Sequence, residues 1–218
     1  MSKNPFDIII DNGPSIIILC AAPKSGKTYM VKYLMNELFK KKKLDYGICF
    51  CPTNFTGAYD YLPEHYIHSQ YNENTFINFY NIQIEQIKKN KKCKPAFVIF
   101  DDCIGSVNFE SNKFKKIIST YRHPNLTLIF TTQYIKALPT ILRECASFFI
   151  TFRQSKEISF KGIQENFMND YNLKEVKKII GKIPKYRFLL ICLEEDDDKK
   201  YNFNGKAPDK YKEIKIKY

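Results

Sequence analysis

An apolar run that breaks into a loop of small residues constrains the fold of this chain more than any other segment. The run is Ile16–Cys20, and the loop that follows, Ala21–Thr28, ends in Gly-Lys-Thr. In a phosphate-binding loop, backbone N–H groups surround phosphate oxygens, a lysine neutralises the β/γ charge and a hydroxyl reaches Mg²⁺. The segment therefore predicts a buried strand followed by a nucleotide site. Its predicted nucleotide-binding residues are Ala22, Pro23, Lys24, Ser25, Gly26, Lys27 and Thr28, and Thr28 is also a predicted metal ligand.

One residue departs from the usual loop pattern. Ala21 stands where the pattern G-x-x-x-x-G-K-[ST] has its first glycine. Alanine lets the backbone approach a ligand closely but resists a positive φ, so we expect the loop to enter in a conformation that L-residues allow. A Gly-Lys-Thr tripeptide can also begin a helix that binds nothing. The strand before it and the amphipathic helix after it favour the nucleotide site.

Apolar runs alternate with helical patterns in the order that builds a parallel sheet. Buried strands without polar alternation indicate a doubly wound α/β sheet with helices on both faces. Strands are predicted over Ile16–Cys20, Gly47–Cys51, Ala96–Phe100, Leu126–Thr131 and Phe148–Phe152, and helices over Lys27–Lys41, Asn74–Lys89, Asn112–Tyr121 and Ile141–Cys145.

The pattern weakens after Arg153. A helix that carries Leu173, Val176, Ile180 and Ile183 precedes a strand over Arg187–Leu193, the acidic run Glu194–Asp198 indicates a turn, and partial order at most is expected over Tyr201–Tyr218. We therefore expect a nucleotide-binding core at residues 1–155. The C-terminal extension, residues 156–218, is expected to pack on this core or to continue it.

Composition narrows the class of partner. Lys and Arg total 35 against 23 Asp and Glu, a net charge of +12, which favours a polyanion such as nucleic acid. Solubility together with an AT-rich genome explains the same excess. The seven cysteines form no C-x-x-C pair and the three histidines no ligand set, which argues against zinc and fits a reducing compartment. No secretory leader and no apolar run of membrane-spanning length is present, so no transmembrane segment is expected.

Two adjacent acids follow a second buried run. Ala96–Phe100 precedes Asp101 and Asp102, which lie about 75 residues after Lys27 at the strand end where α/β sheets bind ligands. We expect Asp101 to hold Mg²⁺ through water, together with Thr28, and Asp102 to accept a hydrogen bond from an attacking water. Two acids alone could simply cap the next helix. Their combination with the phosphate loop predicts nucleotide hydrolysis.

A polar amide follows a third buried run. Gln133 comes directly after the apolar segment that begins at Leu126. An amide at this position can sense a γ-phosphate or an attacking water, and it can equally be the first residue of the next helix. The residues alone do not separate these two readings.

These segments together resemble a known superfamily. The ordered set Ala21–Thr28, Val98–Asp102, Tyr121-Arg122-His123 and Leu128–Gln133, followed by Leu138-Pro139 and Arg143, resembles the FtsK–HerA superfamily. More narrowly, it is similar to the poxvirus-type genome-packaging ATPases of large DNA viruses and virophages. The likeness covers roughly residues 10–155.

The resemblance implies a RecA-like P-loop NTPase core that uses ATP and Mg²⁺. It further implies a homo-oligomeric ring, a pentamer or hexamer, that translocates double-stranded DNA into a preformed capsid. Capsid or inner-membrane virion proteins would be further partners, and the host cytoplasm at the viral assembly site, or the virion, would be the location. Carried over by residue, Lys27 and Thr28 take the phosphate and metal roles, Asp101 binds metal, Asp102 activates water and Gln133 is the sensor amide. Many superfamily members have Glu in place of Asp102, which puts the turnover rate in question.

The family also calls for an arginine from the adjacent subunit to stabilise the phosphoryl group in transfer. The planar guanidinium can meet two oxygens at once and stays charged. Arg122, just before the sensor strand, is the first candidate, followed by Arg143 and then Arg153. Each could instead form a salt bridge within its own chain. A trans arginine would make the isolated monomer slow, because such groups contribute on the order of 10³-fold or more.

Two other functions remain open. A P-loop nucleoside or nucleotide kinase shares the loop and the α/β core, but the acid pair with Gln133 suits the positioning of water, which a kinase excludes. A nucleotide-gated virion assembly factor would bind ATP and capsid protein without processive turnover. Ala21 slightly favours this third reading, and the otherwise complete set of site residues argues against it.

DNA contacts of a packaging motor would be made mostly to phosphates, because the motor must accept any sequence. Lys113, Lys115 and Lys116 are candidates, although solvation of a helix surface explains them equally well. The runs Lys40–Lys43 and Lys88–Lys94 are expected at a helix C-terminus and in a solvated loop before a strand, and either could also face DNA.

Overall fold

A computed structural model describes residues 6–90, 93–195, 201–213 and 216 of the chain. It contains one sheet of eight strands in the order β3-β2-β4-β5-β1-β6-β7-β8. The strands are β1 (Ile16–Cys20), β2 (Tyr46–Phe50), β3 (Ile67–His68), β4 (Ala96–Phe100), β5 (Leu126–Thr132), β6 (Phe148–Thr151), β7 (Arg187–Cys192) and β8 (Tyr201–Lys206). Strands β1 to β6 pair in parallel, whereas β7 runs antiparallel to β6, and β8 antiparallel to β7.

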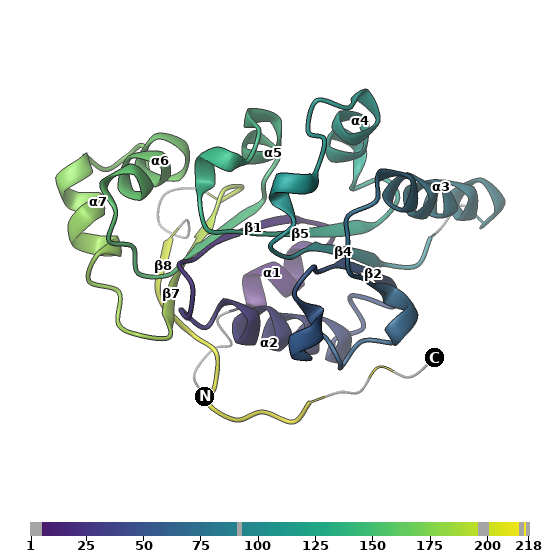
Figure 1. Ribbon diagram of the computed structural model, residues 1–218, viewed down its shortest axis with the longest axis horizontal. Helices are drawn as coiled ribbons and strands as arrows, with labels where there is room; N and C mark the ends of the chain where they lie inside the picture. The colour runs from purple at the N-terminus through teal and green to yellow at the C-terminus, as the bar shows by residue number, and fades with distance from the viewer. Residues whose placement is uncertain (1–5, 91–92, 196–200, 214–215, 217–218) are drawn as a thin grey trace.

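Helices cover both faces of the sheet (Figure 1). One face carries α1 (Asp7–Asn12) and α2 (Lys27–Lys40), and the other carries α3 (Glu73–Asn90), α4 (Asn112–Thr120), α5 (Thr140–Glu144), α6 (Glu157–Phe167) and α7 (Leu173–Ile180). Short 3₁₀ turns lie in the connections: η1 (Asn54–Thr56), η2 (Glu64–Tyr66), η3 (Ile104–Ser106) and η4 (Ile135–Ala137). Each face has its own buried cluster. The predicted doubly wound α/β architecture with helices on both faces is confirmed.

The apolar pattern accounts for the centre of the sheet. Strands β1, β4 and β5 are buried at every position, as central strands between two helical layers require. Helix α2 buries Val31, Leu34, Met35 and Leu38 against the sheet, because these positions share one face at helical spacing. Across the residues described, no helix combines the length and apolar character needed to cross a bilayer.

Several expectations outside the centre need correction. Strand β8 lies in a segment where only partial order was expected, and helix α6 was not predicted at all. Lys88 and Lys89 form the last turn of α3, in agreement with the predicted helix over Asn74–Lys89 and not with the loop predicted over Lys88–Lys94. Ile183 lies beyond the end of α7. Of the acidic run, positions 196–198 lie outside the described residues.

Strand direction defines two edges of the sheet. The carboxyl edge is where the parallel strands β1 to β6 end, and the amino edge is where they begin. Because β7 is antiparallel, it begins at the carboxyl edge and ends at the amino edge. Strand β8 reverses again and ends at the carboxyl edge.

Candidate nucleotide-binding site

The phosphate loop leaves β1 at the carboxyl edge and turns into α2. Ala21 is buried, and its N–H donates to the Thr132 carbonyl at 3.0 Å, which extends the pairing of β1 with β5. The left-handed conformations of the loop fall on Lys24 (φ 60°) and Gly26 (φ 95°). The prediction that the loop enters through an L-compatible conformation at Ala21 is therefore confirmed. Gly26 is where a glycine is needed, since bulkier residues resist this φ.

The start of α2 offers donors to an anion. Gly26 is the N-cap, and its carbonyl accepts the Met30 N–H at 3.0 Å. The first N–H groups of a helix have no partner within the helix and carry the positive end of its dipole. Beside them, the buried Ser25 hydroxyl has no hydrogen-bond partner in the described part of the chain. A buried polar atom without a partner is uncommon in a folded protein, and here it lies in the loop that phosphate would fill.

The acid pair meets the loop lysine, although 75 residues separate Lys27 from Asp102. The Lys27 Nζ lies 2.5 Å from Asp102 Oδ1 and 3.6 Å from Asp101 Oδ1. Asp101 is 2% exposed, and it also accepts from the Thr131 hydroxyl and, at 3.6 Å, from the Cys51 thiol. Strands β2, β4 and β5 thus converge on one carboxylate. The arrangement concentrates negative charge and oxygen ligands opposite the phosphate loop.

Asp102 is held in an unusual backbone conformation. Its φ is 51°, in the left-handed region, where a residue other than glycine is uncommon and Asp and Asn are among the most tolerated. The Asp102 N–H donates to Thr131 Oγ1 at 3.2 Å. One threonine hydroxyl therefore fixes both acids. Sequence reasoning missed Thr131, and the available signal was a hydroxyl residue near the end of an otherwise apolar strand at the carboxyl edge.

Two other predicted residues lie at the same edge. Gln133 directly follows β5 and is exposed. Because β5 lies between β4 and β1, Gln133 is near the ends of the strands that carry the acids and the phosphate loop. Arg153 follows β6 and is also exposed. The sensor role of Gln133 stays a prediction.

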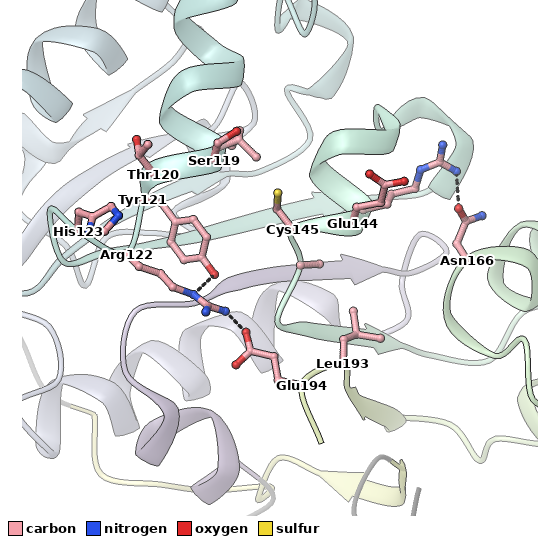
Figure 2. A pocket seen from close by; sticks show the side chains of 13 residues that line it. Ser119, Thr120, Tyr121, Arg122, His123, Glu144, Cys145, Asn166, Leu193 and Glu194 are labelled. Carbon is pink, nitrogen blue, oxygen red and sulfur yellow. Dashed lines mark hydrogen bonds and ion pairs between the residues drawn. The ribbon is translucent and has the colours of Figure 1, made fainter. Parts of the chain in front are cut away.

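Arg122 and Arg143 lie at the opposite edge. Both line a hollow of about 530 Å³ at the amino edge, formed by the residues before β5 and β6 and those after β7. Figure 2 shows Arg122 between Tyr121 and Glu194. Its Nε donates to the Tyr121 hydroxyl at 3.0 Å, its guanidinium pairs with Glu194, and the bond to Tyr121 is the main cause that raises the pKa of Arg122. Arg143 donates to Asn166 and Thr140. The topology places both arginines away from the phosphate loop of their own chain.

The arrangement defines a class of protein. The chain is a P-loop NTPase, because it combines three features: a mostly parallel sheet, a phosphate loop after the first strand, and an acid pair after β4 that contacts the loop lysine. The chain belongs to the poxvirus A32 protein family, whose profile matches residues 10–187. A curated relative is the uncharacterized protein 075L of Invertebrate iridescent virus 6, 25% identical over 181 residues that cover 76% of this chain and 68% of that protein.

Solved structures share the fold. The genome packaging NTPase B204 of Sulfolobus turreted icosahedral virus 2, in complex with ATP-γ-S, matches 89% of this chain and 98% of its own with a TM-score of 0.67 and 18% identity. The DNA-packaging ATPase B204 of Sulfolobus turreted icosahedral virus matches 90% of this chain and all of its own with a TM-score of 0.67 and 17% identity. At these identities the likeness establishes a common fold.

Proposed function

We propose that this chain is an ATP-hydrolysing motor that translocates double-stranded viral DNA into a preformed capsid. The observation that carries the proposal is the contact of Lys27 with the two acids that follow β4, in a chain of the poxvirus A32 protein family. The two B204 proteins, a genome packaging NTPase and a DNA-packaging ATPase, support the same reading.

The site residues divide the work of hydrolysis. Backbone N–H groups over 22–28 bind the phosphates, and Lys27 neutralises the charge of the β- and γ-phosphates. Asp102 orients a water in line with the γ-phosphate, and Gln133 senses that phosphate from the end of β5. Lys27 contacts both acids in this structure. We therefore expect a triphosphate to take over Lys27 and leave Asp102 free to face the water.

The residues present fit Mg²⁺, which would neutralise phosphate charge when bound. Thr28 and Asp101 offer the hydroxyl and carboxylate oxygens that this ion prefers. In the part of the chain that the structure describes, no three His, Cys, Asp or Glu side chains gather into a metal site of their own. A magnesium site held by one or two protein oxygens and completed by phosphates and water is the usual arrangement in nucleotide enzymes.

A ring would place the amino edge of one subunit against the carboxyl edge of the next. Arg122 is exposed and Arg143 half-exposed at the amino edge, so either could serve the site of an adjacent subunit in a pentamer or hexamer. Residues 156–218 would form an extension of the ATPase core. This extension includes β7 and β8, which continue the sheet of the core. Capsid or inner-membrane virion proteins would be partners at the cytoplasmic assembly site or in the virion.

The DNA contacts would be phosphate contacts. Lys113 and Lys116 are exposed on α4, while Lys115 pairs with Glu110 at 2.6 Å. Binding through such groups should weaken steeply as salt rises, because it releases counterions. The net charge of +12 favours this partner.

The proposal is tested by steady-state ATP hydrolysis over a protein concentration series, with and without long double-stranded DNA. The rate per subunit should rise with concentration and with DNA. Lys27→Ala should abolish turnover, and Asp102→Asn should leave ATP binding intact while it lowers the rate about 10²- to 10⁴-fold, as loss of a general base does.

Each alternative predicts a different result. Turnover that is flat with concentration and insensitive to DNA contradicts the motor and points to a kinase, which phosphate transfer to a nucleoside would reveal. ATP binding without turnover in the wild-type protein favours an assembly factor.

A further inference from the structure

An aromatic hollow lies beside the phosphate loop at the carboxyl edge. Its volume is about 220 Å³, and its walls include Gly26, Tyr29, Phe152, Tyr186 and Phe188. Tyr29 and Tyr186 are 41% and 54% exposed, although most large apolar side chains of the described residues are buried. Exposed aromatic rings around a partly enclosed hollow are typical of sites that bind flat organic groups.

The position of the hollow matches one end of a bound nucleotide. The γ-phosphate must lie on the side of Asp102, since the acid pair serves the bond that is cleaved. The phosphate chain then crosses the loop and the first N–H groups of α2, which include that of Tyr29. Tyr29 also borders the hollow. A nucleoside attached to the α-phosphate would therefore emerge next to it.

Tyr186 is the residue that most needs an explanation. It has φ 62°, an uncommon left-handed conformation for a bulky residue. Its ring lies against the phosphate loop, because a Cβ added to Gly26 would be 3.2 Å from Tyr186 Cδ1. Lys185 Nζ lies 4.8 Å from the centre of the ring. Unfavourable backbone conformations that persist in a folded protein concentrate at ligand sites.

We propose that this hollow holds the nucleoside end of ATP and that the ring of Tyr186 stacks on the base. The inference rests on the proposed function, because it needs a nucleotide in the phosphate loop. It also gives the C-terminal extension a role at the site, since Tyr186 and Phe188 both come from β7 or its entry.

The far wall of the hollow comes from the chain after β7. Lys206 ends β8, and Ala207 and Asp209 follow it in the lining. The Tyr29 hydroxyl donates to the Pro208 carbonyl at 2.7 Å, which ties this wall to the start of α2. The wall lies beyond residue 187, where the family match ends. Nucleoside binding is thus the part of the site in which this chain can differ from its family.

The lining is suited to stacking on the face of a base more than to hydrogen bonding with its edge. Aromatic and aliphatic groups dominate it, and Lys206 and Asp209 pair with each other at 3.0 Å. Stacking on an aromatic ring is tolerant of base identity because every base has a π-face. We expect the affinities for ATP and GTP to agree within about tenfold, the difference that 1.4 kcal/mol makes.

The test compares ATP with a ligand that has no base. Isothermal titration calorimetry measures Mg-ATP and inorganic tripolyphosphate binding to the wild-type full chain, Tyr186→Ala and Tyr186→Phe. Tyr186→Ala should weaken ATP binding roughly 5- to 150-fold, the range for loss of one base–aromatic stack. Its tripolyphosphate affinity should stay unchanged, and Tyr186→Phe should keep both affinities. Phe55→Ala removes an aromatic ring that is 88% exposed away from this hollow and serves as the matched control.

A second pair of variants locates the base. Tyr186 also borders a neighbouring hollow of about 370 Å³, whose lining includes Ser155 but not Ala207. Ala207→Phe should fill the proposed hollow and weaken ATP binding, whereas Ser155→Phe should not. The inference is overturned if Tyr186→Ala binds ATP like the wild type, if it weakens both ligands in parallel, or if only Ser155→Phe interferes. Base-dependent binding in a protein without DNA-stimulated turnover supports this inference and contradicts the proposed motor.

Discussion

The two edges of the sheet both pair a cation with a carboxylate, but they do so in different environments. At the carboxyl edge, the Lys27 side chain is 10% exposed and that of Asp101 is 3% exposed, although Asp102, the nearer acid, is 32% exposed. At the amino edge, the Arg122 side chain is 57% exposed and that of Glu194 is 32% exposed. Removing one partner of a buried pair leaves an uncompensated charge, whereas an exposed pair contributes about 0–1 kcal/mol.

The difference in exposure indicates that the carboxyl edge binds a ligand within its own chain, whereas the amino edge can contact another molecule. Lys27 can leave the acids at low cost only for a ligand that replaces their negative charge, as a phosphate does. Arg122 can leave Glu194 at little cost because that pair is exposed, although Arg122 also donates to the Tyr121 hydroxyl at 3.0 Å. The buried cluster is therefore held in place by its own chain, whereas the exposure of Arg122 fits the role proposed for it at the site of an adjacent subunit.

The largest expected effect comes from mixing two inactive variants. Lys27→Ala and Arg122→Ala should each lower ATP turnover of the assembled protein by about 10³-fold or more, because one lacks the loop lysine and the other the trans arginine. A one-to-one mixture should regain activity at about a quarter of its interfaces, where an intact loop meets an intact arginine. Turnover of each variant and of the mixture is measured at the same total concentration.

Arg143→Ala is the matched control, since Arg143 lines the same hollow. Rescue of Arg143→Ala in place of Arg122→Ala would move the trans role to that residue. A mixture that stays inactive in both cases would show that neither arginine completes a neighbouring site. Chemical unfolding followed by circular dichroism should give Arg122→Ala a free energy of unfolding within about 1 kcal/mol of the wild-type value, because the lost pair is exposed.

A smaller effect is expected from the hydroxyl that fixes both acids. Thr131→Val keeps the shape of the side chain but removes the donor to Asp101 and the acceptor for the Asp102 N–H. We expect the free energy of unfolding to fall by about 1–3 kcal/mol, because buried polar groups lose a partner. Turnover should fall on the order of tenfold as Asp102 loses its position.

Thr127→Val provides the comparison for this substitution. Thr127 is buried on β5, as Thr131 is, but four residues earlier and away from the acids. Urea unfolding and ATP turnover are measured for both variants. Equal loss of turnover in the two would mean that Thr131 acts through strand packing and not through the acids.

Buried thiols near the carboxyl edge should make the free energy of unfolding depend on pH in the alkaline range. Burial raises the pKa of Cys20 and of Cys103 to about 12, from 9.0. A raised pKa in the folded state means that the stability is fully present below pH 9 and is lost as pH rises toward 12. Between these values each thiol should lower the free energy of unfolding by about 1.4 kcal/mol per pH unit.

Cys20→Ala should reduce this slope, as measured by urea unfolding at a series of pH values. Cys145→Ser should reduce the slope less, because Cys145 is only half-buried in the hollow of the amino edge, although burial raises its pKa as well. An unchanged slope in Cys20→Ala would contradict the assignment to that thiol.

The centre of the fold could be predicted because local and global rules agree there. Strands β1 and β4 are five-residue apolar runs, buried throughout, and their residues match the predicted bounds. That the acid pair would lie at the same edge as the phosphate loop followed from one rule, that parallel strands end at the same edge. This rule needs no side-chain detail, so the acid pair could be placed from sequence. The direct contact of Lys27 with Asp102 was not predicted.

The periphery depends on contacts that no local pattern reveals. Helix α6 contains Gly162, which weakens a helical signal, but an added Cβ there would be 2.5 Å from Ile135 Cγ2. The glycine lets the helix approach η4 closely. Strand β8 contains polar residues and a glycine, and it forms because its backbone pairs with that of β7. The hydrogen bonds of Thr131 and the pairing of Arg122 with Glu194 likewise join residues whose neighbourhood only the folded chain sets.

The smallest expected effect tests the exposed pair directly. Glu194 accepts from Arg122 and, at 3.1 Å, from Asn12. Glu194→Gln removes the charge and keeps the size of the side chain, so the free energy of unfolding should change by less than about 1 kcal/mol. The change should shrink further at 1 M salt, where the Debye length is about 3 Å. Chemical unfolding at low and high salt measures both.

Asp101→Asn, which removes a charge from the buried cluster, should cost more at either salt concentration. A loss above about 2 kcal/mol in Glu194→Gln, or one that salt leaves unchanged, would mean that Arg122 is anchored like Lys27. An arginine anchored in that way could not turn toward a neighbouring subunit without a large cost in free energy, and the contrast between the two edges would fail.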